Sequence, residues 1–254
     1  MQMTQLITRL GRSDVKLIRR DRFLIFMFLF TVYISVALRF LLPWLNTNLA
    51  ERGVMPGDTI PIPLSDIYPM LVAYMALYSG ALLVGTIFGF MLLDEKDHNT
   101  LKAMFVTPVT PGQYALYKVG LPAVLSFFVV IAMVLVIDQA LLPLGQLILI
   151  SAGAALTAPI IALFFPLVAE NKVAGFAYAK FAGISGWTIL IGFFIAAPWQ
   201  WLFGLFPPFW VSKAYWLALD GNGLWWVALL LGFVLQGVTI RWMLRSFGKV
   251  AYRT

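Results

Sequence analysis

Six long apolar segments set the strongest constraint on how this chain can fold. They cover residues 23–45, 67–93, 116–137, 141–168, 173–196 and 224–244. Each can cross a bilayer, because a helix needs about 20 apolar residues to span a hydrocarbon core about 30 Å thick. Only 11% of the residues are charged, against about 25% in a typical soluble protein. The sequence therefore predicts an all-α integral membrane protein in which residues 1–254 form a single domain of six transmembrane helices.

The basic residues are distributed very unevenly over the two sides of this six-helix arrangement. Fifteen of the eighteen lie in the N-terminal tail, after the second and fourth segments, and in the C-terminal tail; the exceptions are Arg39, Arg52 and Lys213. Because loops rich in Lys and Arg stay in the cytoplasm, both termini are predicted to be cytoplasmic in a multi-pass plasma-membrane protein. The net charge of +7 thus reflects topology, and no nucleic-acid partner is expected.

Residues 1–22 combine apolar and basic positions at roughly helical spacing. This pattern predicts an amphipathic helix on the cytoplasmic membrane surface, with basic side chains beside lipid headgroups, among them Arg12, Lys16, Arg19 and Arg20. A solvated basic tail in contact with anionic lipid is the alternative.

The stretch before the last apolar segment is rich in aromatic residues. Indole rings favour the membrane–water interface, so residues 203–219 are expected to form a short interfacial or re-entrant helical hairpin. Pro207 and Pro208 mark its turn.

Small residues recur at four-residue steps in two of the segments. Such spacing lets helix backbones approach closely inside a membrane. These positions therefore predict either packing within the chain or the seam of a homodimer; they are Ala81, Gly85 and Gly89 in the second segment and Gly175, Ala179 and Gly183 in the fifth.

The sequence lacks the residues that several kinds of chemistry require. The chain has no cysteine and one histidine, His98, so a metal site, a bound cofactor or a catalytic centre is not expected. Ionisable residues are almost absent from the interiors of the segments, which argues against an ion-coupled transporter. No GxxxxGK[ST] phosphate loop is present, so this chain is not expected to hydrolyse ATP or to act as an enzyme by itself.

The segment that follows the second span, residues 92–119, carries the densest group of charges outside the N-terminal tail. Acidic residues come first and Lys102 follows, which matches the sign of a helix dipole. Leu101, Met104 and Phe105 fall on one face, and Thr107 with Pro108 would end the helix. The pattern predicts a short helix lying across the cytoplasmic surface, for which an ordinary interfacial connector is the alternative.

This segment resembles the signature of the type 2 permease family of ATP-binding cassette (ABC) exporters, in which a glutamate-rich start leads through Gly-Thr-Leu-Glu to a Thr-Pro pair. The matching positions are Glu95, Lys96, Asp97, Thr100, Leu101, Met104, Thr107 and Pro108. Asn99 stands where the family usually has glycine, and Lys102 replaces an acidic residue. The resemblance extends to the basic N-terminal helix, the six spans and the aromatic hairpin at 206–210.

The resemblance implies a permease subunit of the small bacterial multidrug type, in the cytoplasmic membrane. The coupling helix, which would contact the ATPase, is assigned to Asp94, Glu95, Lys96, Asp97, His98, Asn99, Thr100, Leu101, Lys102, Met104 and Phe105. Two copies of a separate ATPase, which would bind ATP and Mg²⁺, are expected with a second permease copy, giving a homodimer. The cargo is expected to be hydrophobic or amphipathic, drug-like or lipid-like. An ion-coupled secondary transporter or channel, and a membrane assembly scaffold, remain the alternatives.

Overall fold

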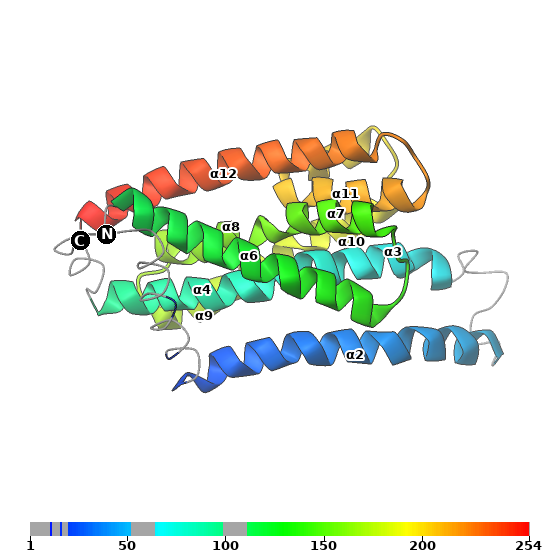
Figure 1. Cartoon of the computed structure of the whole chain (residues 1–254), viewed down its shortest axis with the longest axis horizontal. Coiled ribbons are helices and arrows are strands. Elements are labelled where there is room, and N and C mark those ends of the chain that lie inside the picture. Colours follow the sequence, from blue (N-terminus) through cyan, green and yellow to red (C-terminus); the bar gives the residue numbers. More distant parts are fainter. Residues whose placement is uncertain (1–10, 12–15, 17–19, 52–63, 99–110, 254) are drawn as a thin grey trace.

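The computed structural model describes residues 11, 16, 20–51, 64–98 and 111–253, and regular structure across these residues is helical throughout (Figure 1). Six of the helical stretches are long and apolar enough to cross a membrane: Arg22–Asn48, Ser65–Asp97, Leu116–Ile137, Leu144–Val168, Lys172–Phe194 and Trp225–Phe247. The predicted all-α, six-span fold is confirmed. The predicted bounds differ from these by a few residues at most span ends.

Three of the spans are single helices, and three are broken into shorter ones. The first, third and sixth spans are α2 (Arg22–Glu51), α6 (Pro111–Ile137) and α12 (Trp225–Arg253). The second runs through η1 (Leu64–Ile67), α3 (Tyr68–Val72), the π-helical η2 (Ala73–Tyr78) and α4 (Ser79–Asp97). The fourth and fifth are each split in two, into α7 (Leu144–Ala155) with α8 (Thr157–Val168), and α9 (Lys172–Ser185) with α10 (Trp187–Phe194).

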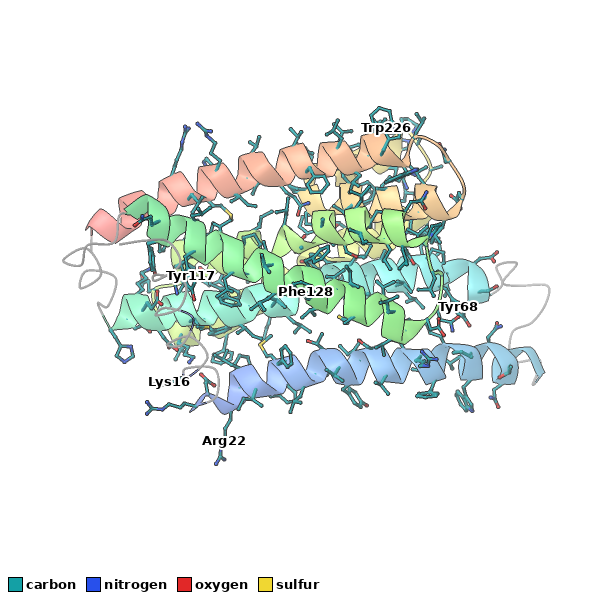
Figure 2. The ribbon with its side chains drawn as sticks, viewed as in Figure 1. Lys16, Arg22, Tyr68, Tyr117, Phe128 and Trp226 are labelled. Atoms are coloured by element: carbon teal, nitrogen blue, oxygen red, sulfur yellow. The ribbon has the colours of Figure 1, made fainter. Side chains whose placement is uncertain are left out.

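The two ends of the bundle differ in chemistry, one being basic and the other aromatic. The start of α2, the end of α4 and the end of α12 lie at the same end of the bundle (Figure 1); this basic end carries Lys16 and Arg22 (Figure 2). The opposite, aromatic end carries Tyr68 and Trp226 (Figure 2). Basic side chains thus gather at one end, in agreement with the alternation that the charge pattern predicts.

The breaks in the fourth and fifth spans are single tight turns. At each, a backbone N–H donates to the carbonyl three residues earlier in the chain, whereas in an α-helix it donates to the carbonyl four residues earlier. Leu156 bonds to Gly153, and Gly186 to Gly183. At the second break the ring of Tyr78 packs so closely that a Cβ on Gly186 would lie 2.2 Å from it. The Tyr78 hydroxyl bonds to the Ala182 carbonyl at 2.6 Å. The π-helical segment of the second span therefore fits against the break in the fifth.

The core lies between α4 and α8. In the second span, 83% of the residues in the most apolar window are buried, whereas in the first and fifth spans the corresponding share is 22%. A Cβ on Gly85 would lie 2.5 Å from the Ala158 carbonyl oxygen, and one on Gly89 would lie 2.4 Å from the Phe165 ring. The small residues of α4 thus let α8 approach closely, while α2 presents a largely exposed apolar surface suited to lipid.

The aromatic hairpin is present between the fifth and sixth spans. It consists of η3 (Trp199–Leu205) and α11 (Pro207–Leu219), which meet at Phe206. The first helix begins four residues earlier than predicted. The Trp216 indole N–H donates to the Pro69 carbonyl at 3.2 Å, and the Tyr215 hydroxyl donates to the Ala140 carbonyl at 2.6 Å. The hairpin is therefore tucked into the aromatic end of the bundle.

The turn between the third and fourth spans is the boundary that hydropathy marks least clearly. Asp138 and Ala140 have positive φ angles of 56° and 51°, which non-glycine residues seldom adopt. Arg39 reaches across from α2, pairs with the Asp138 carboxylate at 3.3 Å and donates to the Val136 carbonyl. The Arg39–Asp138 ion pair, which lies outside the basic end, thus stabilises the turn between the third and fourth spans.

Candidate functional site

The charged residues predicted to begin the coupling helix form the last turn of α4. Asp94, Glu95, Lys96 and Asp97 end the helix, and His98 caps it, with its Nδ1 2.8 Å from the Asp94 carbonyl. The remaining predicted coupling residues lie outside the described residues; these are Asn99, Thr100, Leu101, Lys102, Met104 and Phe105. The site described here is therefore the junction between α4 and the predicted coupling segment.

Glu95 joins α4 to the start of α6. Its carboxylate accepts a 2.6 Å hydrogen bond from the Lys118 ammonium and another from the Tyr114 hydroxyl. Lys118 is only 3% exposed, and its Nζ lies 5.5 Å from the Tyr114 ring centroid and 5.7 Å from that of Tyr117. A buried ammonium needs this kind of pairing. Lys118, which the charge count groups with the basic residues after the second segment, thus lies inside α6 and is buried.

Lys172 joins three chain segments at the basic end. Its ammonium lies 2.9 Å from the Asp21 carboxylate, just before α2, and 3.0 Å from the Asp94 carboxylate. Its backbone N–H donates to Asp97 at 3.3 Å. Asn171, immediately before it, caps α9 by accepting from the Ala174 N–H at 3.0 Å. One lysine at the start of α9 therefore holds the starts of α2 and α9 to the end of α4.

Asp21 is the N-cap of α2. Its carboxylate accepts from the backbone N–H groups of Phe23 at 2.9 Å and Leu24 at 3.4 Å, as N-capping residues commonly do. Burial acts to raise the pKa of Asp21, but the hydrogen bonds from Lys172 and Phe23 and the Lys172 charge outweigh it, so the pKa lies below its ordinary value. Asp21 is accordingly an ionised partner for Lys172.

Lys96 extends to the end of α8. Its ammonium donates to the carbonyls of Pro166 at 3.1 Å and Ala169 at 2.9 Å. The last carbonyls of a helix have no partner within the helix, and a cation placed there also complements the helix dipole. The end of α4 is therefore bonded to α6, α8 and α9, and through Lys172 it is linked to Asp21, the residue that precedes α2.

The sequence predicts Asp94, Glu95, Lys96 and Asp97 as site residues, but not the residues that pair with them. Asp21, Tyr114, Lys118 and Lys172 were not predicted as site residues. The available signal was the charge count, which places Lys118 and Lys172 on the same side of the membrane as Asp94 and Glu95. It could not say which cation meets which anion.

The other predicted site residues have mixed placements. Lys16 and Arg20 are exposed, while Arg12 and Arg19 lie outside the described residues. Ala81, Gly85 and Gly89 are buried, the two glycines against α8. On α9, a Cβ on Gly175 would lie 2.6 Å from Leu93, whereas one on Gly183 would have no heavy atom within 4 Å; Ala179 is half-buried. Packing within the chain thus accounts for the α4 positions and for Gly175.

The fold and the charged junction define a polytopic α-helical membrane protein. The sequence profile of the family described as fluoroquinolones export permease protein Rv2686c-like matches residues 14–244. The chain belongs to this family.

Two relatives from Mycobacterium tuberculosis agree with this assignment. The chain is 29% identical over 239 residues to the fluoroquinolones export permease protein Rv2686c of strain H37Rv, and equally to the protein MT2760 of strain CDC 1551. The alignment covers 92% of this chain and 90% of each relative. No solved structure matches. The resemblance to exporter permeases that the sequence suggests is therefore confirmed.

Proposed function

We propose that this protein is the permease subunit of an ATP-driven ABC exporter that moves drug-like or lipid-like amphipathic molecules out of a bacterial cell. The observation that carries this proposal is the family match over residues 14–244, together with relatives that are named fluoroquinolones export permeases. Fluoroquinolone-like compounds are accordingly the first cargo to test. ATP and Mg²⁺ would bind to a separate ATPase, and this chain would hold no cofactor.

The orientation that fits this function places the basic end in the cytoplasm. Fifteen of the eighteen basic residues fall on that side of the six-span arrangement, and positive charge is retained in the cytoplasm during insertion. The N-terminal segment and the end of α4 would then face the compartment in which ATP is available. The aromatic end would face the outside of the cytoplasmic membrane.

The junction at the end of α4 supports a mechanical role for the segment that follows it. A force applied to residues 99–105 by a closing ATPase would reach α4 first. Because Glu95 and Lys172 bond this helix end to α6, α9 and the start of α2, the force would be shared by several spans. Packed helices respond to such a force by rigid-body shifts. We expect two permease copies and two ATPase copies in the assembly, as the family resemblance implies.

Co-purification with the cognate ATPase tests this assignment. A Leu101→Asp plus Phe105→Asp change should abolish co-purification, because charge would replace the apolar anchors of the predicted coupling helix. Glu95→Ala should weaken it by loosening the junction, and Glu170→Ala, an exposed acidic residue at the same end, is the matched control. ATPase retention by the double variant, in protein that still elutes as a single folded species, would contradict the site assignment and favour a scaffold.

A further inference from the structure

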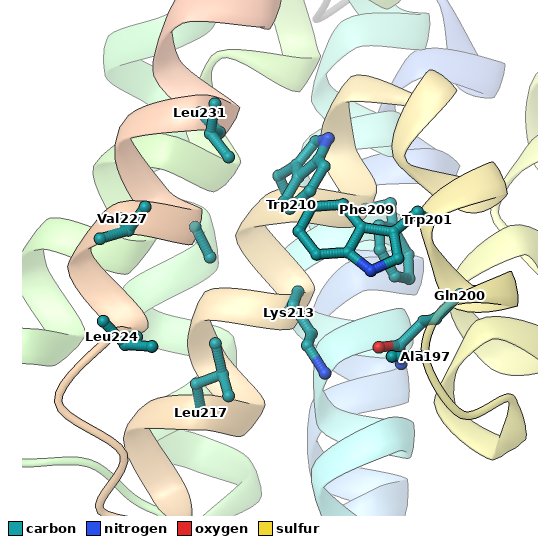
Figure 3. Close-up of a pocket in the computed structure, with 11 residues that line it drawn as sticks. Ala197, Gln200, Trp201, Phe209, Trp210, Lys213, Leu217, Leu224, Val227 and Leu231 are labelled. Carbon is teal, nitrogen blue, oxygen red and sulfur yellow. The ribbon is translucent and has the colours of Figure 1, made fainter.

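An apolar cavity lies at the aromatic end, between the hairpin and α12. Its volume is about 250 Å³, and it is lined by aromatic side chains from η3 and α11 and aliphatic ones from α11 and α12 (Figure 3), among them Trp201, Phe209, Trp210, Leu217, Val227 and Leu231. Pockets for drug-sized ligands measure about 300–1,000 Å³. This cavity can therefore hold the ring system of such a ligand while the rest extends outward.

The aromatic wall of the cavity is held in place by its own contacts. The rings of Trp201 and Trp210 lie edge to face, with centroids 5.5 Å apart. The Trp210 indole N–H donates to the Gly204 carbonyl at 2.8 Å, and a Cβ on Gly204 would lie 2.7 Å from that indole. Phe209 behind them is 1% exposed. A flat ring entering the cavity would thus meet a preorganised aromatic surface, which lowers the entropic cost of binding.

Lys213 is the single cationic residue lining this cavity. Its side chain is half-buried, and it makes no ion pair within the described part of the chain. Burial lowers the pKa of Lys213, and the charge of Asp220 opposes this only in part. A partly buried ammonium without a close counter-ion is stabilised when an anion binds beside it.

Gln200 contributes the second polar group of the cavity. Its amide nitrogen is engaged by the Gly192 carbonyl at 2.7 Å, which fixes the side chain. In Figure 3 the Gln200 amide and the Lys213 ammonium extend toward the same part of the cavity from η3 and α11. One of the two N–H groups of the Gln200 amide is engaged by Gly192. Lys213 is the charged residue of the lining, so Lys213 is the group that selects an anion over a neutral ligand.

We propose that this cavity binds a planar aromatic carboxylate, with the carboxylate on Lys213 and the ring against Trp201 and Trp210. Charge-assisted hydrogen bonds are the stronger kind, and aromatic walls favour flat rings over flexible acyl chains. That the ligand is cargo near its point of exit rests on the proposed export function and its orientation. The binding itself depends on neither.

Equilibrium dialysis with the full chain in nanodiscs tests the proposal. The probes are quinoline-3-carboxylate and the neutral quinoline-3-carboxamide. The unaltered protein should bind the carboxylate more tightly than the carboxamide. Lys213→Met should weaken binding of the carboxylate about tenfold or more and leave binding of the carboxamide unchanged. Lys213→Arg should restore most of the affinity. Lys180→Met removes an exposed charge from α9, away from the cavity, and is the matched control.

Three results would overturn the proposal. They are equal affinity for the two probes, carboxylate binding to Lys213→Met as tight as to the unaltered protein, and carboxylate binding that disappears when phosphatidylglycerol is added to the nanodisc. The last would identify a lipid-headgroup site. The dialysis contains no ATPase, so it is independent of the export assay. If the carboxylate does not bind but ATP-driven export is observed, this inference alone is refuted. If the carboxylate binds but no ATP-driven export is observed, the proposed function alone is refuted.

Discussion

Replacing Lys172 by methionine should loosen the basic end measurably. The change keeps the length of the side chain but removes the ammonium that lies 2.9 Å from Asp21 and 3.0 Å from Asp94, leaving two carboxylates facing each other without a cation. A hydrogen bond to a charged group contributes about 1.5–3 kcal/mol. These side chains are 21–29% exposed, so solvent reduces that value, and we expect a total loss of about 2 kcal/mol.

This loss corresponds to a decrease of about 4–8 °C in Tm for a chain of this size, measured by thermal unfolding in nanodiscs. Lys180→Met, on the exposed side of the same helix, should change Tm by less than about 1 °C. Adding Asp94→Asn to Lys172→Met should recover roughly half of the loss, because it removes the repulsion between the carboxylates. Equal Tm values for Lys172→Met and Lys180→Met would refute the role of this ion-pair network.

The pH dependence of the same difference has a definite sign. The pKa of folded Asp21 lies below its ordinary value of 3.8, so the stability it contributes is fully present above pH 3.8 and is lost as the pH falls through the folded pKa. The Tm difference between the unaltered protein and Lys172→Met should therefore stay constant from pH 7 to about pH 5 and shrink below pH 3.8. A difference that grows on acidification would contradict this assignment.

Three further substitutions test the packing by thermal unfolding. Gly85→Ala places a Cβ 2.5 Å from a backbone oxygen of α8 and should lower the free energy of unfolding by about 1–3 kcal/mol. Gly120→Ala, whose Cβ would meet nothing within 4 Å, should be neutral or stabilising. Equal effects of the two changes would refute close α4–α8 packing. Tyr78→Phe removes the 2.6 Å bond to α9 and should cost about 1 kcal/mol, so an unchanged Tm would argue against it. Arg39→Met breaks the pair with Asp138, whose side chains are 44% and 48% exposed, and should cost less than about 1 kcal/mol; a larger loss would show that this turn carries more of the stability than its exposure suggests.

The parts of the fold that depend on one segment at a time were predictable from the sequence. Span positions follow from apolar length, and the hairpin follows from Pro207, Pro208 and the surrounding indole rings. Among the described residues, the charge count groups Lys96, Lys118 and Lys172, which lie at the basic end. Each of these inferences needs only local composition and the physical properties of a bilayer.

The parts that depend on contacts between distant segments were not predictable. The Asp21–Lys172 pair joins residues 151 positions apart, and no local pattern selects it over other pairings. The burial of Lys118 was also not predictable, because it depends on Glu95 and two tyrosine rings that offset the cost of removing its charge from water. The cavity around Lys213 likewise exists only once η3, α11 and α12 have come together.

ATP-dependent uptake into inverted membrane vesicles tests the central claim most directly. Vesicles containing this chain and its cognate ATPase should accumulate a fluoroquinolone when ATP is supplied, and an ionophore that collapses ion gradients should leave the uptake intact. Vesicles lacking either protein should accumulate none. Uptake that follows an ion gradient without ATP would identify a secondary transporter, and no uptake of any amphipathic compound with both proteins present would contradict the exporter assignment.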